Sequence, residues 1–115
     1  SNTLTTEVTM ATAATRIDAE ALESKAAEVA DILRALANDR RMLILCRLVE
    51  EGEATVGALA TDVGLSQSAL SQHLARMRDE GIVTFRRESR TIWYRIADPR
   101  IGTLLSTLYR LYCRD

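Results

Sequence analysis

The sequence predicts a mostly α-helical fold with one β-hairpin, in the order of four helices, two strands and a final helix. Two observations carry this prediction. Apolar residues recur at helical spacing through most of the 115 residues, and two β-prone segments flank a charged turn late in the chain. With 47% hydrophobic residues, a chain of this length closes one core rather than two. It has no run of about 18 apolar residues and no signal-peptide order at its start, so we expect a cytoplasmic protein.

The first two helices are predicted from Asp18 to about Leu36 and after Asn38, whose side chain can cap a helix. Their apolar stripes are Leu22, Ala26, Val29, Leu33 and Leu36 in the first helix, and Met42, Leu43, Leu45, Cys46 and Val49 in the second. Residues 1–15 show no helical periodicity and are expected to form a flexible tail.

Two short helices joined by a tight turn are predicted between Thr55 and Gly81. The apolar residues of the first fall at i, i+3, i+4 and i+7, and they are Val56, Leu59, Ala60 and Val63. Gly64 ends this helix because glycine adopts the left-handed conformation readily, and Ser66 can cap the next one. The second helix buries Leu70, Leu74 and Met77. This arrangement is a helix-turn-helix.

The outer face of the second short helix is polar but uncharged early in its length. It carries Gln67, Ser68, Ser71 and Gln72. Glutamine pairs bidentately with adenine, and serine bonds bases or phosphates in a major groove. An ordinary solvated face is the alternative, but such a face is more often charged in a chain with 27% charged residues. The outer face therefore predicts a DNA reader.

A β-hairpin follows, with strands at Ile82–Phe85 and Thr91–Ile96 around the turn Arg86–Arg90. A hairpin directly after a recognition helix is a wing, whose arginines can neutralise phosphates; a solvated loop is the alternative. Residues 66–96 carry six arginines against three acidic residues, whereas residues 1–35 carry three basic against six acidic residues. The net charge of −1 therefore conceals a basic reading face and an acidic opposite end.

The last helix is predicted to begin with Asp98 as its N-cap and Pro99 in its first turn. Its apolar residues are Leu104, Leu105, Leu108, Tyr109 and Tyr112. One small domain cannot bury both terminal helices, so we expect a homodimer, which would also place two recognition helices on an inverted repeat of double-stranded DNA. The expected dimer surface joins Leu22, Val29 and Leu33 of the first helix to Leu105, Leu108 and Tyr109 of the last.

The segments LRALANDRRMLILCRL and SQSALSQHLARMRDEGIV resemble the ArsR family of winged-helix bacterial repressors, and the resemblance covers nearly all of Asp18 to Cys113. It implies that residues 16–115 form a winged helix-turn-helix domain for DNA binding and dimerisation, which senses a chemical signal and then releases operator DNA. The implied groove contacts are Gln67, Ser68, Ser71 and Gln72, with Arg87 and Arg90 on the wing.

The residues argue against two classes of function. A metal sensor of this family needs ligands that are missing, because VGALATDVG has no cysteine and the sole histidine, His73, lies in the reading helix. We expect no cofactor; haem binding through Cys113 or His73 is a minor alternative. We also expect no enzyme, since the sequence contains neither a phosphate loop nor a Ser/His/Asp set.

The two cysteines, Cys46 and Cys113, are 67 residues apart and act together only if the fold brings the second helix against the last. Spacing alone leaves packing residues and reactive thiols equally open. RMLILCRL and LYRLYC resemble the persulfide-responsive branch of the family, the BigR/SqrR-like regulators, and the related HlyU-type regulators. That resemblance implies redox-sensing thiols that hydrogen polysulfide or an organic persulfide joins through a polysulfur bridge, which derepresses sulfide-detoxification genes.

Three arginines flank these cysteines in sequence, Arg47, Arg110 and Arg114. Cationic groups near a cysteine favour the thiolate that attacks sulfane sulfur, so arginines at these positions are consistent with reactive thiols. The alternative is a constitutive or peroxide-responsive regulator, an anti-silencer of the HlyU type, in which no polysulfide bridge forms.

Overall fold

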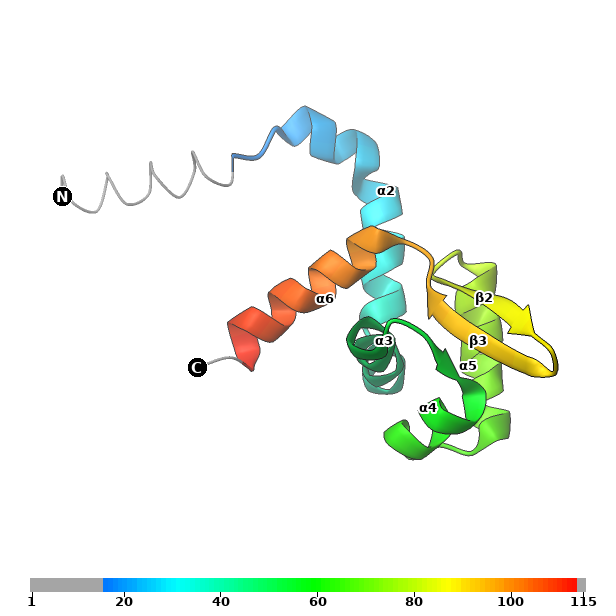
Figure 1. Ribbon diagram of the computed structural model, residues 1–115. Helices are drawn as coiled ribbons and strands as arrows, with labels where there is room; N and C mark the ends of the chain where they lie inside the picture. The colour runs from blue at the N-terminus through cyan, green and yellow to red at the C-terminus, as the bar shows by residue number, and fades with distance from the viewer. Residues whose placement is uncertain (1–15, 114–115) are drawn as a thin grey trace. The chain divides into compact units, whose positions relative to one another are not determined.

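The computed structural model describes residues 16–113 and confirms the mostly helical fold with a β-hairpin (Figure 1). The elements are α2 (Ala19–Leu36), α3 (Asp39–Glu51), β1 (Ala54–Thr55), α4 (Val56–Val63), α5 (Gln67–Asp79), β2 (Val83–Glu88), β3 (Thr91–Ile96) and α6 (Pro99–Tyr112). The predicted order holds, with one addition: the two-residue strand β1 pairs with β3 and gives a sheet of order β1-β3-β2. The expected flexible tail lies outside the described residues.

The chain divides after Asp31 into two units. Most of α2 belongs to the first, and there the apolar stripe is open to solvent, with Leu22 48% and Val29 38% exposed. The helix begins at Ala19, and the carboxylate of the preceding Asp18 accepts hydrogen bonds from the backbone N–H groups of Glu20 and Ala21 at 3.1 and 3.3 Å. Within residues 16–113, no helix is both long and apolar enough to cross a membrane.

The second unit, from Ile32 onward, is organised around one apolar core. Its fully buried large side chains come from every helix of the unit after residue 38 and from β2: Ile44, Leu45, Leu48, Leu59, Leu70, Leu74, Met77, Val83 and Ile101. The predicted stripes of the helix-turn-helix thus face this core. Burial of the stripe holds α5 in place and turns its polar face outward.

Local capping chemistry sets the helix ends, as predicted. The Asn38 side chain accepts the N–H of Arg41 at 3.1 Å, and the Ser66 hydroxyl accepts the N–H of Ala69 at 3.1 Å. Gly64 has a φ of 69°, in the left-handed region that a side chain disfavours. Gly64 and Ser66 together make the tight turn between α4 and α5.

The hairpin is longer than the sequence predicts. The strand expected to end at Phe85 continues to Glu88, which pairs with Thr91, so the loop is only two residues rather than five. Ser89 in this loop has a φ of 58°, a conformation that costs a non-glycine residue about 1 kcal/mol. Within the extended strand, Arg86 pairs with Trp93, and its side chain forms the contacts described below.

Candidate functional site

The four predicted base-reading residues of α5 are all exposed: Gln67, Ser68, Ser71 and Gln72. They do not all point the same way. In a helix with 3.6 residues per turn, Ser68 and Gln72 lie opposite buried Leu70 and Leu74. The side chain of Gln67 is directed toward α4. Its amide nitrogen lies 3.9 Å from the position that a Cβ atom on Gly57 would take. Ser68 and Gln72 are therefore the most outward polar groups of this helix.

The wing brings Arg87 and Arg90 to the exposed end of the hairpin. Within residues 16–113, neither side chain forms an ion pair or a hydrogen bond. Alternation along β2 places Arg87 on the same face as Phe85, and the guanidinium of Arg78 in α5 lies 5.4 Å from the centre of the Phe85 ring. Arg87 is therefore on the face of the wing that is turned toward the reading helix.

Arg86 has a different role from the one predicted for the wing arginines. Its guanidinium lies 2.6 Å from a carboxylate oxygen of Glu53 and 2.7 Å from Glu88, and its Cζ is 5.5 Å from the Trp93 ring centre. Hydrogen bonding to Arg86 lowers the pKa of Glu53. Arg86 therefore links the wing to the segment before β1. Because its charge is paired with Glu53, the wing has less unpaired positive charge than the sequence of residues 66–96 indicates.

Two further arginines, which no pattern in the sequence singles out, support the helix-turn-helix from α3. Arg40 donates from Nη1 to the carbonyl of Val63, at the end of α4, over 3.2 Å. Arg41 lies 3.6 Å from a carboxylate oxygen of Glu80, at the end of α5. No local sequence signal identifies these contacts, because their partners are 23 and 39 residues away.

The two thiols come from helices that pack against each other. Cys46 lies in α3 and Cys113 directly follows α6, and these two helices are in contact. Both cysteines are exposed and both are free thiols. The fold therefore brings together the two helices that carry the cysteines, as a joint role of the thiols requires. Cys46 is exposed and is not a packing residue of the core.

The arginines that flank the cysteines in the sequence do not lower the pKa of Cys46. The pKa of its thiol is raised, first by partial shielding from water, then by the negative charges of Cys113 and Glu50. Arg47 instead pairs with Glu50 at 3.4 Å, and Arg110 donates to the hydroxyl of Thr107 at 3.2 Å. Arg114 lies outside the described residues. Cys46 is therefore mostly protonated at neutral pH, and its reaction as a nucleophile becomes faster as the pH rises.

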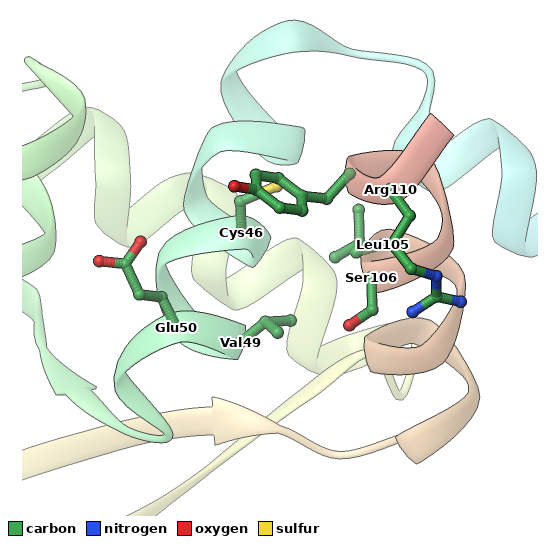
Figure 2. A pocket seen from close by; sticks show the side chains of 7 residues that line it. Cys46, Val49, Glu50, Leu105, Ser106 and Arg110 are labelled. Atoms are coloured by element: carbon green, nitrogen blue, oxygen red, sulfur yellow. The ribbon is translucent and has the colours of Figure 1, made fainter. Parts of the chain in front are cut away.

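An open groove of about 580 Å³ lies beside Cys46, between α3 and α6. Its lining is Cys46, Val49 and Glu50 from α3, with Leu105, Ser106, Tyr109 and Arg110 from α6. Figure 2 shows the side chains of Cys46 and Val49 directed toward α6, and that of Glu50 directed away from it. Cys113 follows Tyr109 by four residues, which places it one turn further along the same side of α6.

No group of three or more histidine, cysteine or acidic side chains within residues 16–113 is arranged to hold a metal ion. His73 is half-buried in α5 and does not belong to the helix pair that carries the thiols. The polar groups that line the groove are one thiol, two hydroxyls, one guanidinium and one carboxylate.

Comparison with known proteins gives a consistent result. Residues 38–84 match the model of the bacterial regulatory proteins of the arsR family. The transcriptional activator HlyU of Vibrio cholerae is 42% identical over 93 residues, which are 81% of this chain and 85% of HlyU.

Solved structures agree with this match. The transcriptional repressor BigR from Xylella fastidiosa superposes with a TM-score of 0.79 at 37% identity, over 86% of this chain and all of BigR. Reduced HlyU from V. cholerae gives 0.75 at 41% identity, over 82% and 98% of the two chains. These relatives are named as regulators of transcription and not as enzymes. The chain belongs to the arsR family of bacterial regulatory proteins and is a DNA-binding transcriptional regulator with a winged helix-turn-helix.

Proposed function

We propose that the protein is a dimeric repressor that senses persulfides or polysulfides through Cys46 and Cys113 and then releases its operator, so that sulfide-detoxification genes are expressed. One observation supports this most strongly. Two exposed thiols from α3 and α6 lie near enough for the charge of Cys113 to raise the pKa of Cys46. A covalent link between them would fix the separation of two helices that otherwise only pack together.

The proposed chemistry uses the sulfane sulfur of the inducer as the oxidant. A cysteine thiolate attacks the outer sulfur of a persulfide R–S–S–H, the sulfur–sulfur bond breaks, and R–S⁻ leaves and takes up a proton. When Cys46 and Cys113 both carry an added sulfur, one persulfide attacks the inner sulfur of the other. HS⁻ leaves and a bridge of three sulfurs joins the helices.

Such a bridge explains why the sensor would prefer sulfane sulfur to other oxidants. A direct disulfide requires Cα atoms about 4.4 to 6.8 Å apart, whereas a bridge with extra sulfur spans a wider gap. Cysteines whose Cα atoms are held beyond this distance can be joined only by the longer link. We therefore propose that peroxide and oxidised glutathione, which supply no extra sulfur, are poor inducers.

The test is a comparison of inducers on one protein–operator complex. A polysulfide donor should release the DNA, while hydrogen peroxide and oxidised glutathione at the same concentration should leave most of it bound, as measured by fluorescence anisotropy of labelled operator. Reduction with dithiothreitol should restore binding, because the bridge is a chain of reducible sulfur–sulfur bonds. Equal release by peroxide would favour a general thiol-oxidation sensor instead.

A second candidate is favoured by the name of one relative. HlyU of V. cholerae is a transcriptional activator, and it is as similar to this chain as the repressors are. A constitutive or peroxide-responsive anti-silencer of that kind would use the same DNA-reading surface and would form no polysulfide bridge. Its signature is operator occupancy that does not change with polysulfide.

We further propose that the protein acts as a homodimer through its terminal helices. Leu22, Val29 and Leu33 of α2 are 48, 38 and 51% exposed, and Tyr109 of α6 is 59% exposed, which is typical of surfaces that a partner covers. Leu105 is not available for this surface, since it is 4% exposed and belongs to the core. The dimer surface expected on α6 therefore lies further along, at Leu108 and Tyr109.

Sedimentation equilibrium at micromolar concentration should give the mass of a dimer. Leu33→Glu should shift the equilibrium toward monomer, because it buries a charge in the proposed contact. Leu43→Glu is the matched control, since Leu43 is similarly exposed, at 48%, but lies on α3. A parent chain that sediments as a monomer would contradict the proposal.

A further inference from the structure

The wall of the groove formed by α6 carries two hydrogen-bond donors beside Cys46. Ser106 and Arg110 are four residues apart, so they lie one above the other on the same side of the helix. Figure 2 shows both side chains on α6, across the groove from Cys46. Arg110 bonds to the Thr107 hydroxyl but, within residues 16–113, forms no ion pair with an acid, and Ser106 makes no side-chain hydrogen bond there.

The wall formed by α3 does not neutralise the Arg110 guanidinium. Its carboxylate, Glu50, is paired with Arg47 at 3.4 Å and is directed away from α6 (Figure 2). Between the walls, Val49 and Leu105 give the groove an apolar floor. The groove therefore presents, in one space, a thiol, a short apolar surface and a guanidinium that is free to bind an anion.

We propose that Arg110, assisted by Ser106, binds the carboxylate of a low-molecular-weight organic persulfide and thereby holds its sulfane sulfur at Cys46. This inference rests on the proposed function and names the inducer within it. A guanidinium is the side chain best matched to a carboxylate, which it can bind through two parallel hydrogen bonds. Inorganic polysulfide has no carboxylate and cannot form this two-hydrogen-bond contact with Arg110.

The size and lining of the groove agree with such a ligand. A volume of 580 Å³ falls within the range of about 300 to 1,000 Å³ that small-molecule sites usually have. An amino-acid persulfide has a short carbon chain between its sulfur and its carboxylate, and that chain would lie on Val49 and Leu105. Arg110 is a specificity-determining residue in this account and takes no part in the chemistry.

The reaction at the bound ligand is a transfer of one sulfur atom. The Cys46 thiolate attacks the outer sulfur of R–S–S–H, a new bond forms between the two sulfurs, and the bond to R–S breaks. R–S⁻ leaves and is protonated by water. Cys46 becomes a persulfide, and the carboxylate stays on the departing thiol, which diffuses out of the groove.

The experiment compares two donors that differ only in charge, N-acetylcysteine persulfide and N-acetylcysteine amide persulfide, in the Cys113→Ser background, so that only Cys46 reacts. Intact-mass spectrometry follows the rate of sulfur addition. The carboxylate donor should react about three- to fivefold faster than the amide, the value of one exposed charge pair, and this ratio should shrink at high salt. In Arg110→Gln the ratio should fall to about one, and Arg110→Lys should lie between.

Arg90→Ala is the control, because it also removes one exposed arginine but lies on the wing, outside the groove. It should keep the full ratio of the parent chain. An unchanged ratio in Arg110→Gln, with normal sulfur addition from both donors, would overturn the role of Arg110 while leaving persulfide sensing intact. Failure of Cys46 to react with either donor would overturn the proposed function and this inference with it.

Discussion

Cys46→Ser and Cys113→Ser are each expected to bind operator DNA as tightly as the parent chain and to keep it when a polysulfide donor is added. Both cysteines are exposed, and neither belongs to the core, so exchanging sulfur for oxygen leaves the fold and the reading surface unchanged. In the parent chain, the bridge should lower the DNA affinity about 100-fold, which corresponds to a coupling free energy of about 3 kcal/mol. Either substitution should abolish that whole effect.

The two single variants and the double variant should behave alike, because one missing thiol already prevents the bridge. Affinity is measured by anisotropy with and without the donor, at one fixed salt concentration. Ser106→Ala is a suitable control, since it alters the groove but keeps both thiols, and it should still release DNA. Full release by either cysteine variant would rule out the two-thiol mechanism and favour the constitutive regulator.

The second large effect concerns DNA recognition, in which α5 and the wing should play different parts. Gln72→Ala should relax the sequence preference, because a bidentate glutamine–adenine pair contributes about 1 to 3 kcal/mol of discrimination. Gln67→Ala should have the smaller effect, since Gln67 leans toward α4. Arg87→Ala should instead weaken all sequences alike and reduce the salt dependence, by about 0.9 in the logarithmic slope for each phosphate that the variant leaves without its cation.

Selection from random DNA, followed by binding at several salt concentrations, distinguishes these outcomes. The parent chain should select an inverted repeat, because a two-fold dimer presents two recognition helices. Arg86→Ala is an informative comparison, since Arg86 is bound to Glu53 and Glu88 rather than free for phosphate. It should destabilise the wing without lowering the salt slope as Arg87→Ala does. A consensus without symmetry would contradict the proposed dimeric repressor.

The parts of this fold that depend on local chemistry can be predicted from the sequence. Gly64 and Ser66 end one helix and begin the next through contacts within a few residues, and the stripe Leu70, Leu74 and Met77 faces the core because helical spacing requires it. The outward face of α5 follows from the same spacing. The amino-acid pattern alone is therefore sufficient to predict the candidate DNA-reading surface.

The parts that depend on distant contacts cannot be predicted in this way. In the sequence Arg86 belongs to a basic turn, but in the structure it lies within β2 and its partner Glu53 is 33 residues away. This contact pairs the charge of Arg86, which the sequence alone leaves on the basic surface. Likewise, Arg47 is beside Cys46 in the sequence but pairs with Glu50 in the structure. The pKa of the Cys46 thiol is instead raised by partial burial, Cys113 and Glu50. Helical spacing places Leu105 on the dimer surface, although packing of α6 buries it.

The bridge between Cys46 and Cys113 is tested most directly by mapping it in the protein that has been released from DNA. After polysulfide treatment, the released and bound fractions are separated and digested with trypsin under non-reducing conditions, which yields MLILCR (Met42–Arg47) and LYCR (Leu111–Arg114). The two-thiol mechanism predicts that the released fraction contains these two peptides joined by their cysteines, with about 32 Da for each sulfur beyond a disulfide, and that the bound fraction does not. A released fraction in which the two peptides are unlinked would contradict it.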